Sequence, residues 1–356
     1  MTDLAFLLRW LRENDEALLE QLWQQADEIR KRSVGDEVHL RGLIEISSFC
    51  VRRCTYCGLR ADNSALERYR MSEDEIMECV HQAIQFGYGT VVMQSGEDYG
   101  IQSEWMSGII QRIKKETSLA VTLSLGERPE EDLCAWRRAG ADRYLLRFET
   151  SDPDLYRRIH PARAGQIHDR LAMLNTLREL GFEVGSGVMI GIPGQSYDIL
   201  ARDILTFQSM DLDMIGVGPY IPHPETPLAQ ATWETDIPAE EQVPNTELMT
   251  YKVIALTRLV CPEANIPSTT ALATLNLSQG RELGLSRGAN IVMPNLTPVQ
   301  FRSKYEIYPA KACIRESSSD CHLCMNRRIN SIGRTVGKGQ GGRRRKPDME
   351  NTQPIR

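Results

Sequence analysis

"VHLRGLIEISSFCVRRCTYCGLR", residues 38–60, joins an apolar run to three closely spaced cysteines. The first nine residues are mostly aliphatic, and their length and β-branched content predict a buried strand. Cys50, Cys54 and Cys57 follow directly, with the spacing CxxxCxxC. A strand that runs into a loop of potential metal ligands is typical of parallel α/β enzymes, which place their chemistry where strands end.

Seven later runs repeat this pattern of a short apolar strand that ends in polar residues. The eight predicted strands are "VHLRGLIEI", "GTVVMQ", "LAVTLSL", "DRYLLRF", "EVGSGVMIG", "DMIGVGPYI", "NIPSTTA" and "ANIVMP". Predicted helices separate them, such as residues 72–86, which open with Ser72 and Glu75 at the spacing of a capping box, and residues 169–180, which end at Gly181. This alternation predicts an α/β fold, a complete (β/α)8 barrel of the TIM type.

An open, doubly wound sheet is the alternative to the barrel. We favour the barrel because polar residues follow every predicted strand: the cysteine loop, "SGED", "SLGE", "RFET", "GIPG", "YIPH", "STT" and "PNLTP". A closed barrel would bring all eight sets to one C-terminal mouth, whereas an open sheet would spread them along an edge.

The chain divides into four predicted parts. Residues 1–37 form two amphipathic helices that pack on the barrel, which spans residues 38–300. Residues 301–332 form a C-terminal extension with a second cysteine set, and residues 333–356 form a loosely ordered basic tail. Residues 224–247 are rich in Pro and acidic side chains, which fits either a mobile lid or a passive surface insertion.

The composition of the chain limits the classes of molecule that it is expected to bind and the compartment in which it is expected to work. The 356 residues carry a formal net charge of -6, so no global positive field favours nucleic acid or an anionic membrane, and we expect a small-molecule partner. Charged residues interrupt the apolar N-terminus, so we expect neither a secretion signal nor a membrane span. Six of nine cysteines fall in two tight sets, which favours metal ligation over disulfides and predicts a reducing, cytoplasmic location.

The first cysteine set has three thiols and no neighbouring fourth ligand, whereas a closed zinc site needs four. Three thiolates can hold a [4Fe-4S] cluster and leave one iron open to a ligand. A zinc site completed by a distant residue such as His223 is the alternative.

Cys313, Cys321 and Cys324 form the second set. Three thiols again favour an iron-sulfur cluster, [2Fe-2S] or [4Fe-4S], with zinc and His322, or unligated thiols, as alternatives. The remaining Cys79, Cys134 and Cys261 lie on predicted helices, and we expect them to be small buried hydrophobes.

The cysteine spacing resembles that of radical S-adenosylmethionine enzymes. "CTYCGLRADN", "QSGED", "TLSLGE", "DRYLLRFETSDPDLYRRIHP", "GIPGQ", "GPYIPHPETPLA", "IPSTTA" and "GANIVMPN", in this order, further resemble the HydE family of [FeFe]-hydrogenase maturases. The resemblance implies a [4Fe-4S] cluster, S-adenosylmethionine, a reducing electron donor and a 5'-deoxyadenosyl radical. It implies action on an iron-containing, cysteine-derived precursor supplied by HydG, and delivery of the diiron unit to the scaffold GTPase HydF.

The resemblance also implies residue roles. The catalytic cluster falls to Cys50, Cys54 and Cys57. Cofactor contacts fall to Tyr56, Gly96, Glu97, Ser124, Glu149, Arg170, Gly191 and Gly194. Substrate contacts fall to Gln94, Ser95, Thr122, Arg147, Met214, Thr269, Thr270, Met293, Tyr305 and Tyr308. The two Met side chains could equally be core filling, because Met is common inside barrels.

Two other functions fit parts of the sequence. Biotin synthase and the methylornithine-forming mutase share the radical chemistry but act on small organic substrates, and they lack the second thiol set in this form. A non-catalytic iron-sulfur or zinc carrier would leave the polar residues at the strand ends unexplained. Leu296, where many HydE relatives have an aromatic residue, puts the shape of the pocket there in doubt.

Overall fold

A computed structural model describes residues 2–162, 169–230 and 235–343. Its centre is a parallel sheet in the strand order β6-β5-β4-β3-β2-β1-β7. The strands are β1 (Glu37–Ser47), β2 (Thr90–Ser95), β3 (Ala120–Ser124), β4 (Arg143–Leu145), β5 (Glu183–Ile190), β6 (Met214–Pro219) and β7 (Ile291–Val292). Six of these seven follow chain order, so their C-terminal ends meet on one side, as the polar strand ends predict.

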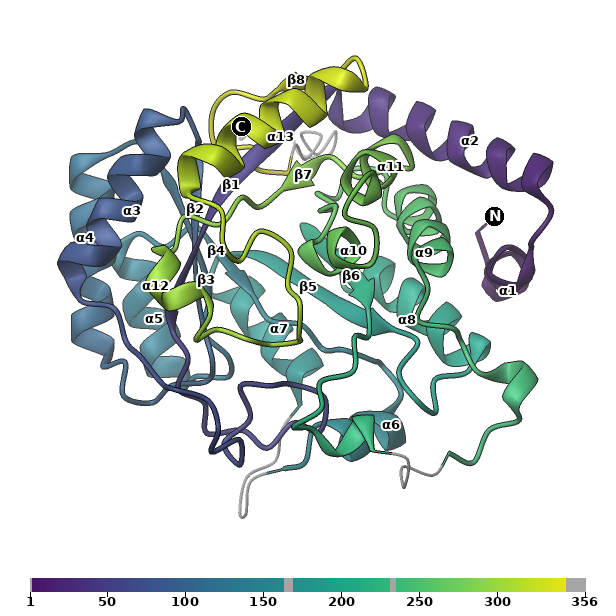
Figure 1. Ribbon diagram of the computed structural model, residues 1–356, viewed down its shortest axis with the longest axis horizontal. Coiled ribbons are helices and arrows are strands. Elements are labelled where there is room, and N and C mark those ends of the chain that lie inside the picture. Colours follow the sequence, from purple (N-terminus) through teal and green to yellow (C-terminus); the bar gives the residue numbers. More distant parts are fainter. Residues whose placement is uncertain (1, 163–168, 231–234, 344–356) are drawn as a thin grey trace, which may run out of the picture.

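Helices surround the strands on the outside (Figure 1). They are α3 (Glu73–Gln85), α4 (Ser103–Glu116), α5 (Glu130–Ala139), α6 (Pro153–Ile159), α7 (Arg170–Glu179), α8 (Tyr197–Ser209), α9 (Glu247–Val260), α10 (Thr270–Leu275), α11 (Gly280–Ser286) and α12 (Val299–Arg302). The predicted capping box is confirmed, because the Ser72 hydroxyl accepts from Glu75 N and the Glu75 carboxylate accepts from Ser72 N. Side chains between strands and helices, such as Trp136 and Phe207, are fully buried.

The prediction of eight regular strands is confirmed only in part. Residues 265–271 form no regular strand, although the backbone bridges the gap between β6 and β7: Ile215 N donates to Asn265 O at 2.8 Å, and Ser268 N donates to Ile291 O at 2.9 Å. Pro267 has no N–H for a ladder, and helix α10 starts at Thr270, so the run is too short for a strand. The structure therefore shows a parallel α/β sheet that forms a partial barrel, and not the complete eight-stranded barrel that the sequence predicts.

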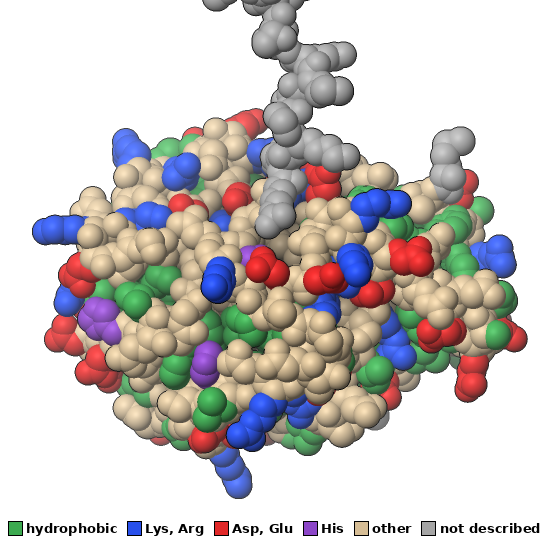
Figure 2. Space-filling model, turned by 90° about the horizontal axis from the view of Figure 1, so that it is seen from above, with side chains coloured by type: hydrophobic (Ala, Val, Ile, Leu, Met, Phe, Trp, Pro, Cys, Tyr) green, Lys and Arg blue, Asp and Glu red, His purple; other side chains and the backbone are tan. Residues whose placement is uncertain are grey.

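The N-terminal helices α1 (Leu4–Arg12) and α2 (Glu16–Val34) pack on α8 and α9 as expected. Buried Lys252 on α9 donates to Leu11 O at 3.1 Å, which fixes the end of α1. The described residues hold no helix long and apolar enough to cross a membrane. On the face in Figure 2, basic and acidic side chains are interspersed and hydrophobic side chains lie in small groups.

The predicted loose tail begins later than residue 333. After α13 (Ser318–Ser331), strand β8 (Thr335–Val336) pairs in parallel with the start of β1. The next residues cross the N-terminal end of the sheet, where Thr90 Oγ1 donates to Gln340 O and Arg41 donates to Gly341 O, both at 2.8 Å. Residues 335–343 are thus attached to the sheet through their backbone atoms and not through apolar side chains. Residues 344–356 lie outside the described residues.

The acidic segment 224–247 contains two short 3-10 helices, η1 (Pro227–Ala229) and η2 (Ala239–Glu241). Gln242 fixes its second half to the loop after β5, because Gly194 N donates to Gln242 Oε1 at 2.8 Å. Residues 231–234 lie outside the described residues. A lid role for this segment stays a prediction.

Candidate active site

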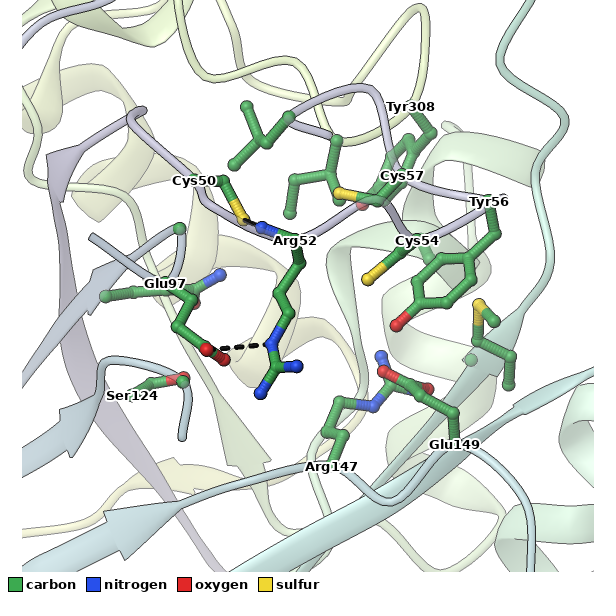
Figure 3. A pocket seen from close by; sticks show the side chains of 18 of the residues that line it. Cys50, Arg52, Cys54, Tyr56, Cys57, Glu97, Ser124, Arg147, Glu149 and Tyr308 are labelled. Carbon is green, nitrogen blue, oxygen red and sulfur yellow. Dashed lines mark hydrogen bonds and ion pairs between the residues drawn. The ribbon is translucent and has the colours of Figure 1, made fainter. Parts of the chain in front are cut away.

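A cavity of about 240 Å³ opens at the C-terminal ends of the strands. Its walls come from the thiol loop after β1, from the loops after β2, β3 and β4, and from residues 305–308 of the C-terminal extension. Figure 3 shows side chains from these segments pointing into one space. The predicted convergence of the polar strand ends is thus confirmed for these loops.

The three thiols of the first set surround one side of this space (Figure 3). Burial raises the pKa of Cys50, and it raises the pKa of Cys54 to about 12. The free thiols therefore hold their protons, and a positively charged iron centre would displace them on binding. The donor set of three soft sulfur ligands on one loop fits an iron-sulfur cluster.

The alternative for the first thiol set is a zinc site completed by His223. Across the described ranges, no three His, Cys, Asp or Glu side chains come close enough together to hold a single ion. His223, the candidate fourth ligand, instead places its Nε2 3.2 Å from Glu306 Oε1.

Close backbone packing positions the thiol loop. A Cβ on Gly96 would lie 2.2 Å from Phe49 O, so this glycine lets the loop after β2 lie against the thiol loop. On the other side, Gly58 N donates to Ile307 O at 2.9 Å, and a Cβ on Gly58 would lie 2.2 Å from Glu306 O. The thiol loop is held between β2 and the C-terminal extension.

Glu97 lies beneath the thiols and is 3% exposed. Its Oε1 lies 2.7 Å from Arg52 Nε and 3.1 Å from the Tyr99 hydroxyl, and its Oε2 accepts from Glu127 N at 2.9 Å. The sequence predicted Glu97 as a cofactor contact but did not single out Arg52 or Glu127. Arg52 could have been noticed as a charged residue inside the cysteine motif.

Arg147 and Glu149 lie across the cavity from Glu97, next to one another (Figure 3). Arg147 Nη2 is 3.4 Å from Glu149 Oε2. Glu149 has φ +65°, a left-handed backbone conformation that is strained for a side chain of this kind and is common at functional sites. Its Oε2 is buried without a hydrogen-bond partner in the part of the chain that the structure describes, so this oxygen can accept from a ligand.

Comparisons with known proteins agree with this geometry. Residues 44–205, which carry the thiols, Glu97, Glu149 and Arg170, match the radical SAM superfamily. The chain is 47% identical over 332 residues to the [FeFe]-hydrogenase maturase subunit HydE of Thermotoga maritima, a match that covers 93% of this chain and 91% of that protein. The chain belongs to the HydE family. It is a radical S-adenosylmethionine enzyme of the hydrogenase maturase type.

Two solved structures share the fold of this HydE-family chain. The crystal structure of the methylornithine synthase PylB has a TM-score of 0.78 at 25% identity and covers 95% of both chains. A structure of the maturase HydG has a TM-score of 0.71 at 19% identity and covers 93% of this chain and 70% of that one, which shows the fold alone.

Only some of the substrate contacts that the HydE family implies lie at this cavity. The cavity is lined by Gln94, Ser95, Arg147, Thr269, Tyr305 and Tyr308, together with the cofactor candidates Tyr56, Gly96, Glu97, Ser124, Glu149 and Arg170. Thr122 and Met214 line a separate small cavity further down the sheet, where Met214 Sδ accepts from Arg41 Nη1 at 3.0 Å. Thr270 and Met293 line neither cavity. Thr270 is instead the first residue of α10.

Gly191 and Gly194 do not line the cavity either. Gly191 has φ +78°, and a Cβ there would lie 2.4 Å from Asn245 Cα. The structure therefore uses this glycine for a tight turn against the segment before α9. Met189 and Tyr220, which the sequence analysis did not single out, line the cavity.

The second thiol set lies on α13 and the loop before it. The neighbouring Cys321 thiol lowers the pKa of Cys313 to about 6, and Cys324 Sγ accepts from Arg328 Nε at 3.4 Å. His322 stacks on Phe86, with ring centroids 4.5 Å apart, and its Nδ1 and Nε2 lie 3.2 Å from the Tyr88 hydroxyl and 3.0 Å from Asn326 Nδ2. Among the other cysteines, Cys79 is buried as expected, whereas Cys134 and Cys261 are half-buried.

Asp203 on α8 fixes the loops behind Glu149. Its Oδ1 accepts from Ser151 N at 2.5 Å, and its Oδ2 accepts from Gln195 Nε2 at 3.1 Å. Burial raises the pKa of Asp203 to about 6. The folded protein therefore takes up a proton between pH 6 and 4 that the unfolded chain, with a pKa near 4, does not.

This shift predicts a pH-dependent stability difference. When the pH falls from 7 to 5, the free energy of unfolding of the unmutated protein should rise by about 1 kcal/mol relative to that of an Asp203→Asn variant. The reason is that the variant has no carboxylate at this position to take up a proton. Urea unfolding of the metal-free proteins at both pH values measures it. An unchanged difference would contradict the raised pKa.

Proposed function

We propose that this chain cleaves S-adenosylmethionine reductively to a 5'-deoxyadenosyl radical and acts on an iron-bound, cysteine-derived precursor. The product would serve the diiron unit of the [FeFe]-hydrogenase active site, the H-cluster. The observation that carries this proposal is that a chain with 47% identity to a HydE maturase places three thiols of one loop at a cavity that also holds charged and hydroxyl side chains. When bound there, a [4Fe-4S] cluster and S-adenosylmethionine supply the radical chemistry.

The residues of the cavity support specific roles. Cys50, Cys54 and Cys57 would hold the cluster. Arg170 would bind the carboxylate of the cofactor, since a guanidinium forks a carboxylate. Glu149 and Ser124 would accept from ribose or ammonium groups, Gly96 and Glu97 would bound the amino end, and Tyr56 would pack near the adenine. Gly191 and Gly194 would act on the adenine only through the turn that they shape.

The far side of the same cavity would hold the substrate. Arg147 offers a positive charge there, and Thr269, Tyr305 and Tyr308 offer hydroxyl groups. Such a lining suits a small anionic or polar iron complex. Residues 305–308 lie against the thiol loop, where Gly58 N donates to Ile307 O, and they would help to exclude water from the reacting groups. The four predicted substrate residues outside this cavity would act on the substrate only indirectly; they are Thr122, Met214, Thr270 and Met293.

Several further features complete the proposal. Residues 265–268 would close the sheet into a full barrel through their backbone bonds to β6 and β7. The division into residues 1–37, 38–300, 301–332 and a tail would be kept, with the loose part starting after residue 343. Cys313, Cys321 and Cys324 would hold a second iron-sulfur cluster. A cytoplasmic reductant, the precursor from HydG and the scaffold HydF would be the partners.

Restoration of hydrogenase maturation tests this function. In a host that lacks its own HydE but produces HydG, HydF and the hydrogenase, the native chain should restore hydrogen evolution. Replacing Cys134, which lies on α5, by Ser should leave this restoration intact. Cleavage of S-adenosylmethionine without any restoration would contradict the maturase function and favour the methylornithine or biotin synthase group.

The methylornithine alternative has less support. The 3-methylornithine synthase of Methanosarcina acetivorans is 29% identical to this chain and covers 78% of it, against 47% and 93% for the HydE maturase. The PylB structure shows that the two groups share a fold, and a shared fold does not decide the substrate.

A further inference from the structure

Two carboxylates and two guanidinium groups alternate beneath the thiol loop, in the order Glu97, Arg52, Glu127 and Arg170. Arg52 Nε lies 2.7 Å from Glu97 Oε1, and Arg52 Nη2 lies 2.6 Å from Glu127 Oε2. Arg170 Nε lies 2.8 Å from Glu127 Oε1. All four residues are at most 9% exposed, so their charges must balance one another inside the protein.

Each of the four residues belongs to a different part of the chain. Arg52 lies between the first two cysteines of the thiol loop, and Glu97 follows β2. Glu127 follows β3, and Arg170 is the first residue of α7. Glu127 uses one oxygen for Arg52 and the other for Arg170. It therefore links the loop that would carry the cluster to the residue that would bind the carboxylate of the cofactor.

Glu127 also sets the orientation of Arg170. The Arg170 guanidinium gives Nε–H to Glu127, one Nη1–H to Arg147 O at 2.6 Å, and one Nη2–H to His160 Nε2 at 2.5 Å. A guanidinium has five N–H groups. Among the described contacts, each terminal nitrogen uses one N–H, so both can still donate to a carboxylate.

Glu127 is ionised in this setting. The two neighbouring guanidinium groups lower its pKa to about 2 against the opposing effect of burial. A neutral amide in its place would keep the shape but could not balance two buried cations. One side of an amide also donates rather than accepts, so it would face an arginine N–H without a partner.

We propose that Glu127 is a positioning residue that sets the spacing between the thiol loop and the cofactor carboxylate by holding Arg52 and Arg170 at once. This inference rests on the proposed function, in which Arg170 meets that carboxylate. Glu127 does not line the cavity, so it would act through Arg52 and Arg170. Its loss should therefore weaken cofactor binding while the three thiols still take up iron.

The test compares Glu127→Gln with Glu131→Gln, an exposed neighbour on α5. Both variants and the native protein are reconstituted anaerobically. Iron and sulfide content, the electron paramagnetic resonance (EPR) spectrum of the reduced cluster, and the Kd for S-adenosylmethionine are then measured. We expect Glu127→Gln to hold native iron, to bind the cofactor at least about tenfold more weakly, a change of ~1.4 kcal/mol, and to show a smaller cofactor-induced spectral change. Glu131→Gln should match the native protein.

A second variant tests the other end of the link. Arg52→Lys keeps the charge but replaces the planar fork by one ammonium, which cannot contact Glu97 and Glu127 in the same way. We expect a raised Kd here too, and less than the sum of both effects in the double variant. Native affinity in either single variant, or additive effects, would overturn the proposal.

The outcomes separate the inference from the proposed function. If Glu127→Gln takes up no iron, the Kd of the Arg52→Lys variant for S-adenosylmethionine decides whether the proposal stands. If the native protein itself binds no S-adenosylmethionine, the proposed function fails, whatever the variants do. If the native protein binds it and the variants bind it equally well, only the role of Glu127 is wrong.

Discussion

Replacing Cys54 by Ala is expected to abolish the catalytic cluster and with it the cleavage of S-adenosylmethionine. Cys54 is buried at the centre of the motif, and no other thiol of the first loop can take its place. We expect product formation to fall by about a thousandfold or more, which is at least ~4 kcal/mol of lost transition-state stabilisation. Iron analysis, the low-temperature EPR spectrum and the yield of 5'-deoxyadenosine measure this loss.

The matched control for this experiment is Cys134→Ser. Cys134 is a half-buried thiol on α5, outside both cysteine sets, and its replacement should change neither iron content nor cleavage. A Cys54→Ala protein with a native cluster spectrum and native cleavage would show that this thiol is not a cluster ligand.

Lys311→Met is expected to destabilise the fold strongly. The Lys311 ammonium contacts the carboxylate of Glu45 on β1. Both side chains are buried, with 6% of Lys311 and 1% of Glu45 exposed. Asn295 Nδ2 also donates to Glu45 Oε2, at 3.0 Å. Removing the lysine leaves a buried carboxylate without its counter-charge, which typically costs about 3 to 5 kcal/mol. Urea unfolding of the metal-free protein measures this change in the free energy of unfolding.

Two controls make the Lys311 prediction specific. The double variant Glu45→Gln, Lys311→Met removes both charges and should regain much of the lost stability. Lys304→Met removes a surface ion pair with Glu67, which is 72% exposed, and should change stability by no more than about 1 kcal/mol. If Lys311→Met were as stable as Lys304→Met, the buried pair would not hold the C-terminal extension to β1.

Most of the fold follows from local sequence patterns. Alternation of apolar runs with capped helices predicts the strands and helices; the Ser72 capping box is confirmed, and the helix predicted over residues 169–180 is α7. The sequence predicted a regular strand at 265–271, where the structure has only isolated backbone bonds to β6 and β7. Pro267 lacks the N–H that a regular strand needs, although neighbouring residues still bond to both strands. The attachment of residues 335–343 was missed because backbone atoms make it, and a Gly-rich sequence carries no apolar signal for them.

The site could be predicted where a motif marks it. The thiols, Glu97, Glu149 and Arg170, to which the resemblance assigns roles, line one cavity, and the roles themselves stay predictions. Arg52 and Glu127 were missed because their importance comes from pairing between different loops. Met214 fell in a separate cavity because a strand position gives the face of the sheet but not the depth at which a cavity ends.

The most direct test of the central claim is the formation of 5'-deoxyadenosine by the native protein. The protein is reconstituted anaerobically with iron and sulfide, reduced, and given S-adenosylmethionine with and without the iron carbonyl cyanide cysteine precursor. A radical enzyme of this family should form 5'-deoxyadenosine, faster when the precursor is present, and its EPR spectrum should change when the cofactor binds. An intact cluster that forms no 5'-deoxyadenosine under either condition would contradict the account.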